Sequence, residues 1–308
     1  MSSLSDTLDD YLALRRSLGY KLERPGQVLG GFVSWLDARG ATHVTIDLAV
    51  TWATRSGDVS DRWRASQLGA VRCFARYAQA LDPAHEVPPA WLLPSGRHRP
   101  VPYLYSDEEV VTLMTAARAL RSPLRAGTLA AIIGLLFVSG IRVGEILRLD
   151  KADLDADART LTVRNSKAGK SRVIPLHAST VGALDAYKAA RGKQTRGSAS
   201  TAMFVSTAGN RLRSGNLGAA FAEVLVRAGL PARTGRQRPR LADLRHTFAM
   251  RTLTTWHREG LDVEALLPLL SAYMGHASFA STFWYLSACP ELLGVAARRL
   301  EAMRTGRR

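Results

Sequence analysis

Five side chains in this sequence are of types that could act together on a phosphate ester. Arginine offers paired, permanently charged donors to phosphate oxygens, and lysine can protonate a departing oxygen. A tyrosine hydroxyl can attack phosphorus and keep the phosphate as a covalent ester. In chain order the candidates are Arg142 in SGIRVGEI (139–146), Lys167 in NSKAGKSR (165–172), Arg245 in ADLRHTFAM (242–250), and His276 and Tyr285 in MGHASFASTFWYLS (274–287).

The stretch around Lys167 contains GKS, the ending of a nucleotide-binding loop, but its surroundings do not fit one. The pattern G-x-x-x-x-G-K-[ST] needs a glycine five residues before Gly169, where the sequence has Arg164. Both flanks, LTVR and RVIPL, carry β-branched residues in rough alternation, as strands do. A nucleotide-binding loop must instead lead into a helix. We therefore expect a hairpin whose tip presents Lys167 and Lys170 to another phosphate.

Other catalytic and metal-binding signatures are missing from the sequence. It has no G-x-S-x-G, no H-E-x-x-H and no D-x-D cluster that would hold magnesium. Cys73 and Cys289 lie far apart without C-x-x-C spacing, which favours a reducing cytosol and argues against structural zinc. An enzyme acting on a phosphate diester without a metal would have to neutralise it with its own cations.

In their order and intervals these motifs resemble the tyrosine recombinase family, also called the phage integrases. The resemblance covers about residues 103–300, and no single motif is specific alone. The matching positions are R-x-x-E at Arg142 and Glu145, the hairpin lysine at Lys167, L-R-H-T-F-A at Leu244–Ala249, and L-x-G-H followed by tyrosine at Met274, Gly275, His276 and Tyr285.

The resemblance implies a role for each residue. Tyr285 would attack the scissile phosphate, leaving a 3′-phosphotyrosyl link and a free 5′-hydroxyl. Arg142 and Arg245 would clamp the non-bridging oxygens, and His276 would hydrogen-bond the phosphate. Lys167 would protonate the 5′-oxygen; Lys170 stays an alternative, but the family's lysine usually precedes the turn glycine. Neither ATP nor a metal cofactor is implied.

Two further residues have expected supporting roles, and one position departs from the family. Glu145 is expected to brace Arg142 rather than touch DNA, and His246 to be a packed helix residue. The family usually has histidine or lysine three residues before the second arginine, but here it is Ala242. Either the protein tolerates a missing helper, or Arg240 or His246 substitutes, or the residue was changed to trap a DNA complex.

The elements that position these residues are predicted to be mainly helical. We expect a two-domain clamp: an N-terminal helical core-binding domain (1–97) and an α+β catalytic domain (98–308) with a small sheet or hairpin. Apolar spacing predicts helices from Leu4 to Gly19, from Val28 to Gly40, after Thr45 and over 60–81. The last should bury Trp63, Val71, Phe74 and Tyr77.

Between the domains, prolines at 83, 88, 89, 94, 100 and 102 predict a linker, packed through Trp91, Leu92 and Leu93. In the second domain a capping box at 106–109 opens a helix, and an apolar helix over 126–139 ends at Gly140. After the hairpin we expect a helix near 178–190, a third strand at MFVS (203–206) and at least four more helices.

The net charge of the chain indicates what kind of partner it binds. Lys and Arg number 42 against 26 Asp and Glu, a net charge of +16, and such an excess usually meets a polyanion. The longest apolar run, ten residues over 129–138, is too short for a bilayer, and the acidic N-terminus is not a signal peptide. The expected DNA-facing residues are Arg62, Arg64, Arg72, Arg76, Lys170, Arg172, Arg236, Arg238 and Arg240.

Together these features predict a cytoplasmic, nucleoid-associated recombinase. Its partners would be double-stranded DNA with specific sites, three further copies in a homo-tetramer, and accessory proteins or partner recombinases. Integration or transposition of a mobile element is the favoured use. Two alternatives remain: type IB topoisomerase-like relaxation, and a catalytically impaired architectural DNA-binding protein. The C-terminal segment 291–308 is expected to be a helix that docks on a neighbouring protomer or folds back on its own domain.

Overall fold

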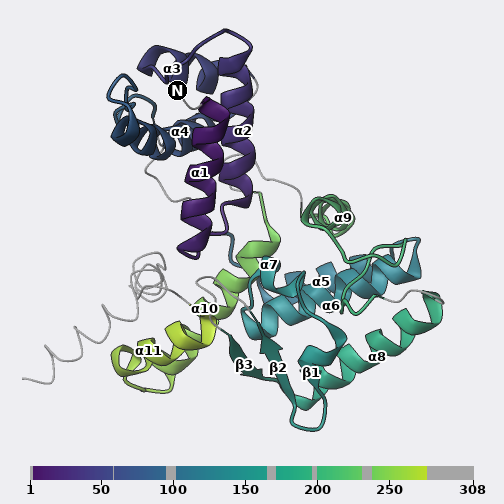
Figure 1. The fold of residues 1–308 in the computed structure, drawn as a ribbon. Helices are drawn as coiled ribbons and strands as arrows, with labels where there is room; N and C mark the ends of the chain where they lie inside the picture. The colour runs from purple at the N-terminus through teal and green to yellow at the C-terminus, as the bar shows by residue number, and fades with distance from the viewer. Residues whose placement is uncertain are drawn as a thin grey trace, which may run out of the picture. The chain divides into compact units, whose positions relative to one another are not determined.

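The chain divides into two compact units, Met1–Arg99 and Pro100–Arg308 (Figure 1). The structure, a computed structural model, describes residues 3–57, 59–94, 102–164, 171–195, 200–230 and 238–275. Each unit has a hydrophobic core of its own. None of the helices in these ranges is long and apolar enough to cross a bilayer.

The described residues of the first unit form four helices, in the places that apolar spacing predicts. Side-chain caps at Ser3, Thr45 and Ser60 open three of them by accepting backbone N–H groups. The core is built on Phe32, Trp52 and Phe74, each almost completely buried. The helices are α1 (Leu4–Ser17), α2 (Glu23–Asp37), α3 (Ile46–Thr54) and α4 (Asp61–Leu81).

Burial along α4 differs in part from expectation. Val71 and Phe74 are buried as predicted, whereas Trp63 and Tyr77 are only half-buried. Trp63 instead has the guanidinium of Arg24 4.4 Å from its ring centroid. A large amphipathic ring can thus cover apolar surface while its edge stays in water.

The described part of the proline-rich linker packs against the first unit. Leu92 and Leu93 contact the core as predicted, but Trp91 is 80% exposed and does not pack there. Arg72 of α4 holds the segment by donating from Nε to the Pro88 carbonyl (2.7 Å) and from Nη2 to the Pro89 carbonyl (2.9 Å).

The second unit is organised around α6 (Pro123–Ser139), which packs against α5 (Asp107–Arg118), α8 (Ala178–Gln194) and α10 (Leu241–Arg258). This helix is apolar on nearly every face, as befits a central helix. The predicted capping box at Ser106 and Glu109 opens α5. The remaining helical elements are α7 (Val143–Ile146), a 3-10 turn (Lys151–Asp153), α9 (Ser214–Arg227) and α11 (Val263–Met274). At least four helices were expected after α8, and the described ranges contain three of them, α9, α10 and α11.

The strands form one antiparallel sheet of β1 (Leu154–Asp155), β2 (Thr160–Val163) and β3 (Arg172–Pro175), in the order β1-β2-β3. The predicted hairpin is β2 and β3, with Leu161 opposite Ile174 and Val163 opposite Arg172. The expected third strand at 203–206 is wrong, since Val205 makes only an isolated bridge, as does the preceding Ala202. A short apolar run buried on all sides does not reveal its own backbone conformation.

Candidate active site

Gly140 sets the position of the first candidate arginine. It ends α6 with φ of +59°, a conformation that glycine adopts without strain. A Cβ at this position would overlap the ring of Phe248 from α10. The turn allows α6 and α10 to approach closely and places Arg142 as the N-cap of α7.

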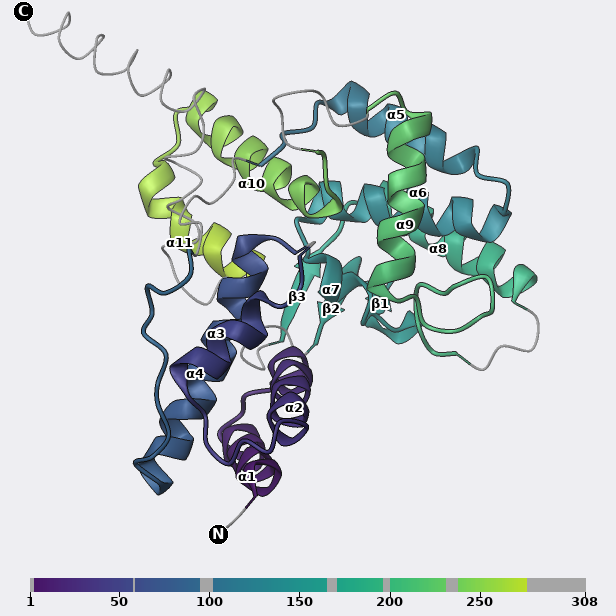
Figure 2. The ribbon, with the colours of Figure 1, turned by 90° about the horizontal axis from the view of Figure 1, so that it is seen from above.

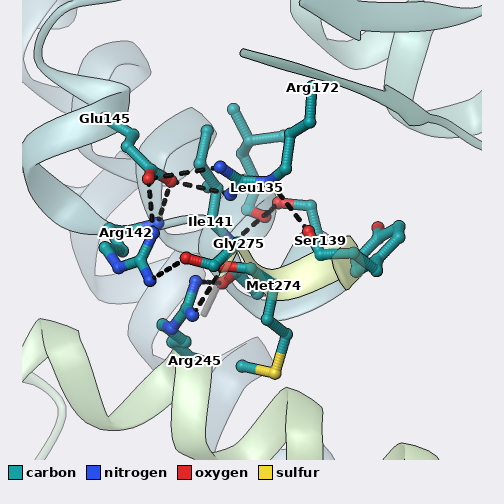
Figure 3. A network of polar contacts seen from close by, with 11 residues as sticks. Leu135, Ser139, Ile141, Arg142, Glu145, Arg172, Arg245, Met274 and Gly275 are labelled. Atoms are coloured by element: carbon teal, nitrogen blue, oxygen red, sulfur yellow. Dashed lines mark hydrogen bonds and ion pairs between the residues drawn. The ribbon is translucent and has the colours of Figure 1, made fainter. Parts of the chain in front are cut away.

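Glu145 of α7 is the central acceptor of this site (Figure 3). Its Oε1 accepts from Nη1 of Arg142 (2.7 Å) and Nη1 of Arg172 (3.2 Å). Its Oε2 accepts from Nη2 of Arg172 (2.8 Å) and the backbone N–H of Arg142 (3.1 Å). The side chain is 1% exposed. The expectation that Glu145 braces Arg142 is therefore confirmed.

Two opposed effects act on the Glu145 carboxyl. Burial raises its pKa, but hydrogen bonds and charge from Arg172 and Arg142 outweigh burial and lower the pKa from 4.5 to about 2. Glu145 is therefore ionised at neutral pH. Arg142 and Arg172 contact this single carboxylate, so the group keeps a net positive charge suited to a phosphate.

The three arginines also converge on the carboxyl end of α11. Arg172 donates from Nε to the carbonyl of Tyr273 (2.8 Å), and Arg245 from Nη2 to that of Met274 (2.8 Å). Arg142 donates from Nη2 to the carbonyl of Gly275. The last carbonyls of a helix lack intrahelical partners and form the negative end of its dipole. Three consecutive carbonyls thus each accept a hydrogen bond from a different arginine.

Gly275 fits this crowded position for two reasons. Its φ is +65°, and a Cβ built on it would lie 2.8 Å from Nη1 of Arg172 and 3.3 Å from Nη1 of Arg142. The chain leads from Gly275 directly into His276. Arg245 fastens this end of α11 to the end of α6, because its Nη1 also donates to the Gly140 carbonyl (2.6 Å).

The three guanidinium groups differ in access to solvent. The side chain of Arg142 is 27% exposed and that of Arg172 12%, while Arg245 as a residue is 8% exposed. Arg142 is thus the most open to an incoming phosphate.

Several predicted residues lie outside the described ranges. These are Lys167, Lys170, Arg236, His276 and Tyr285, together with the segment 291–308. Tyr273, which could in principle replace Tyr285 as the nucleophile, is a packed aromatic. It stacks on Phe248 with ring centroids 5.6 Å apart. Burial raises the pKa of Tyr273, although Arg172 lowers it in part.

The first turn of α10 shows what surrounds Ala242. Ala242 is exposed and lies three residues before Arg245. Arg240, a suggested substitute helper, caps the helix by donating to both oxygens of the buried Asp243, at 2.8 and 3.2 Å. His246, the other candidate, is half-buried on the following turn. Arg238 is exposed.

The predicted basic face of α4 is narrower than expected. Arg64 donates to Asp61 and to the carbonyls of Ser56 and Gly57, and Arg72 holds the linker. Only Arg62 and Arg76 of the four remain exposed. An arginine on a helix surface can bind either DNA phosphates or backbone carbonyls, because its guanidinium donates to both kinds of oxygen.

The guanidinium of Arg172 lies in a place that the sequence analysis did not predict. Arg172 was expected to face DNA, but its guanidinium points inward to Glu145. The signal was in the strand alternation, because Arg172 and Ile174 share one face of β3, and Ile174 is completely buried.

No three His, Cys, Asp or Glu side chains within the described ranges are grouped as a metal site requires. The donors that converge here are guanidinium groups, which suit an anion.

Comparison with known proteins identifies the family. Residues 104–291 match the model of the phage integrase family. A putative integrase/recombinase, y4rB of Sinorhizobium fredii (strain NBRC 101917 / NGR234), is 43% identical over 307 residues, 98% of each chain. The tyrosine recombinase XerD of Mycobacterium tuberculosis (strain ATCC 25618 / H37Rv) is 34% identical over 231 residues, 72% of this chain and 68% of its own.

Solved structures share the fold. The integrase of transposon Tn1549 in complex with transposon right end DNA has a TM-score of 0.67 at 15% identity, covering 98% of this chain and 100% of that one. A lambda integrase dimer bound to a COC′ core site has a TM-score of 0.59 at 20% identity, covering 92% and 95%. The family match covers most of the second unit, including Arg142 and Arg245. The chain therefore belongs to the phage integrase family and is a tyrosine recombinase, an enzyme that transfers DNA strands.

Proposed function

We propose that Tyr285 is the nucleophile of this recombinase and that Arg142 and Arg245 bind the scissile phosphate. The observation that carries the proposal is the convergence of both guanidinium groups on the last carbonyls of α11. Tyr285 comes nine residues after His276, which follows that end directly. The chain thus leads from the carbonyls held by the two arginines through His276 to Tyr285.

The reaction is an exchange of phosphate esters. The Tyr285 oxygen forms a bond to phosphorus, the bond from phosphorus to the 5′-oxygen breaks, and the tyrosine proton passes to solvent or a nearby base. Lys167 supplies a proton to the leaving 5′-oxygen. The arginines offset the charge that grows on the non-bridging oxygens. A 5′-hydroxyl from a second duplex then attacks the phosphotyrosine, which restores the tyrosine and joins the strands.

The substrate of the proposal is double-stranded DNA carrying specific sites, bound by both units and recombined by a homo-tetramer at the nucleoid. Arg62, Arg76, Arg238 and Arg240 are the exposed candidates for contacts with the DNA backbone. Integration or transposition of a mobile element is the favoured use. The relative y4rB bears the name of a putative integrase/recombinase, and the structure of the Tn1549 integrase holds transposon right end DNA.

The test is recovery of DNA bound covalently to the protein in cells, followed by sequencing. We expect a small number of recurrent sites from the wild-type protein and none from Tyr285→Phe. Tyr273→Phe serves as the matched control because it removes a hydroxyl from the same region and should retain the adduct. Absence of a wild-type adduct would contradict the proposal and favour an architectural DNA-binding role, with which Ala242 is consistent. Scattered sites with relaxation of supercoiled DNA would favour topoisomerase action.

A further inference from the structure

Arg172 of β3 shares the carboxylate of Glu145 with Arg142. Nη1 and Nη2 donate to the two oxygens of Glu145 at 3.2 and 2.8 Å, and Nε donates to the Tyr273 carbonyl at 2.8 Å. All three nitrogens of the guanidinium therefore have partners within the protein. Its side chain is 12% exposed, less than half the figure for Arg142.

The bonds of Arg172 join three elements that each carry part of the site. Arg172 begins β3, the edge strand on the side of α10 and α11 (Figure 1, Figure 2). Glu145 belongs to α7, which Arg142 opens, and Tyr273 lies in the last turn of α11. The strand follows directly on the stretch 165–170, which holds both hairpin lysines. A displacement of β3 would thus be transmitted to both other elements.

The fork of Arg172 also fixes the conformation of the Glu145 carboxylate. Each carboxylate oxygen accepts one bond from Arg172 and one from Arg142. Without Arg172, each oxygen would keep a single donor in a buried place. The carboxylate could then rotate, and the Arg142 guanidinium that depends on it would lose its fixed orientation.

Gly275 gives independent evidence that the position of Arg172 is tightly set. A Cβ on Gly275 would lie 2.8 Å from Nη1 and 3.1 Å from Cζ of Arg172. The last turn of α11 is thus packed directly against this guanidinium (Figure 3).

We propose that Arg172 is a positioning residue for strand cleavage: it fixes the Glu145 carboxylate that orients Arg142 and the end of α11 that leads to His276. Arg172 itself does not contact the phosphate. This inference rests on the proposed function.

The test measures DNA affinity and cleavage separately, with a nicked duplex that carries a site recovered by covalent capture. The nick lets the 5′-hydroxyl fragment diffuse away, so the adduct accumulates. We expect Arg172→Ala to keep Kd within about threefold while single-turnover cleavage at saturating DNA falls about 10²-fold, the effect of misplacing a reacting group by about 1 Å. Arg172→Lys keeps the charge without the fork and should recover only part of the rate.

A pH profile separates positioning from a general loss of structure. Cleavage by Arg172→Ala should fall relative to the wild type as pH is lowered from 7 to 5, because Glu145 loses two of the bonds that keep it ionised. Arg211→Ala is the matched control. Arg211 donates to the Leu147 and Leu149 carbonyls and to Asp150, so its loss should leave that profile unchanged.

Three outcomes would overturn the inference. A tenfold or greater rise in Kd, with or without slower cleavage, would make Arg172 a DNA contact. Wild-type cleavage by Arg172→Ala, or by Arg172→Lys if the alanine variant does not fold, would show that the fork is not needed. If the wild-type protein forms no adduct, the proposed function itself fails; an adduct with unchanged variants refutes only the role of Arg172.

Discussion

Replacing Glu145 with glutamine tests the arginine cluster without DNA. The substitution conserves shape but removes the charge between Arg142 and Arg172, and it turns two amide hydrogens toward guanidinium donors. Lowering the carboxyl pKa from 4.5 to about 2 corresponds to roughly 3 kcal/mol, at about 1.4 kcal/mol for each tenfold change in proton affinity. Breaking a buried ion pair costs a similar amount, about 3–5 kcal/mol. We expect Glu145→Gln to lower the free energy of unfolding of the second unit by about 3 kcal/mol at pH 7.

The sign of the pH dependence follows from the direction of the shift. Because folding lowers the pKa of Glu145, its stabilisation is fully present above pH 4.5 and is lost as pH falls toward 2. The difference between wild type and Glu145→Gln should therefore be largest at neutral pH and shrink below pH 4.5.

Hydrogen exchange in a urea series provides the assay, since peptides of α6 and α10 report on the second unit separately. Asp185→Asn is the control. Asp185 pairs with Lys188 on α8 with its side chain 42% exposed, so the substitution should cost less than about 1 kcal/mol. If Glu145→Gln costs no more than Asp185→Asn at pH 7, or if the difference persists unchanged at pH 3, the account of the cluster is wrong.

Three further predictions concern the site and its DNA. Gly275→Ala should slow single-turnover cleavage about tenfold. The new Cβ would lie 2.8 Å from Nη1 of Arg172 and would displace that guanidinium, and a misplacement of about 1 Å can cost about 10²-fold in rate. An unchanged rate would show that the space beside Gly275 is not restricted. Ala242→His should speed cleavage of a nicked site about tenfold, below the roughly 10²–10⁴-fold that acid–base help usually contributes, whereas a slower variant would show that position 242 does not face the phosphate. DNA affinity measured by fluorescence anisotropy should fall about 10³–10⁵-fold between 50 and 200 mM salt if about 6–10 phosphates are contacted, and a flat response would count against extensive backbone contact.

The sequence predicted the elements whose signals are local. Apolar spacing located the helices of the first unit, the box at Ser106 and Glu109 marked the start of α5, and Gly140 marked the end of α6. Alternation located the β2–β3 hairpin. Each of these depends on residues within one or two turns of each other, so the pattern is complete in a short window.

What the sequence did not predict depends on contacts between distant residues. Arg172 and Glu145 are 27 positions apart, and nothing in their spacing indicates that one binds the other. Arg72 was read as a DNA-facing cation, but the linker carbonyls that it binds lie 16 and 17 positions away. An arginine on a helix surface looks the same in sequence whether it meets phosphate or backbone, because both are acceptors for the same fork.

The same limit explains the missed strand. The 203–206 segment reads as a strand by composition, yet the two-residue β1 takes the place beside β2. The backbone N–H of Met203 donates to the Leu149 carbonyl. The segment thus makes single backbone hydrogen bonds with its neighbours and does not form a continuous strand pairing.

Mass spectrometry of the trapped protein–DNA adduct tests the central claim most directly. The complex is formed on a nicked target duplex and digested with nuclease and protease. The peptide that contains Tyr285 should then carry a nucleotide, whose 3′-phosphate is joined to the tyrosine oxygen. Arg142→Ala and Arg245→Ala should each reduce the yield of that peptide while the DNA remains bound. Attachment at Tyr273, attachment through a 5′-phosphate, or undiminished yield without either arginine would contradict the account.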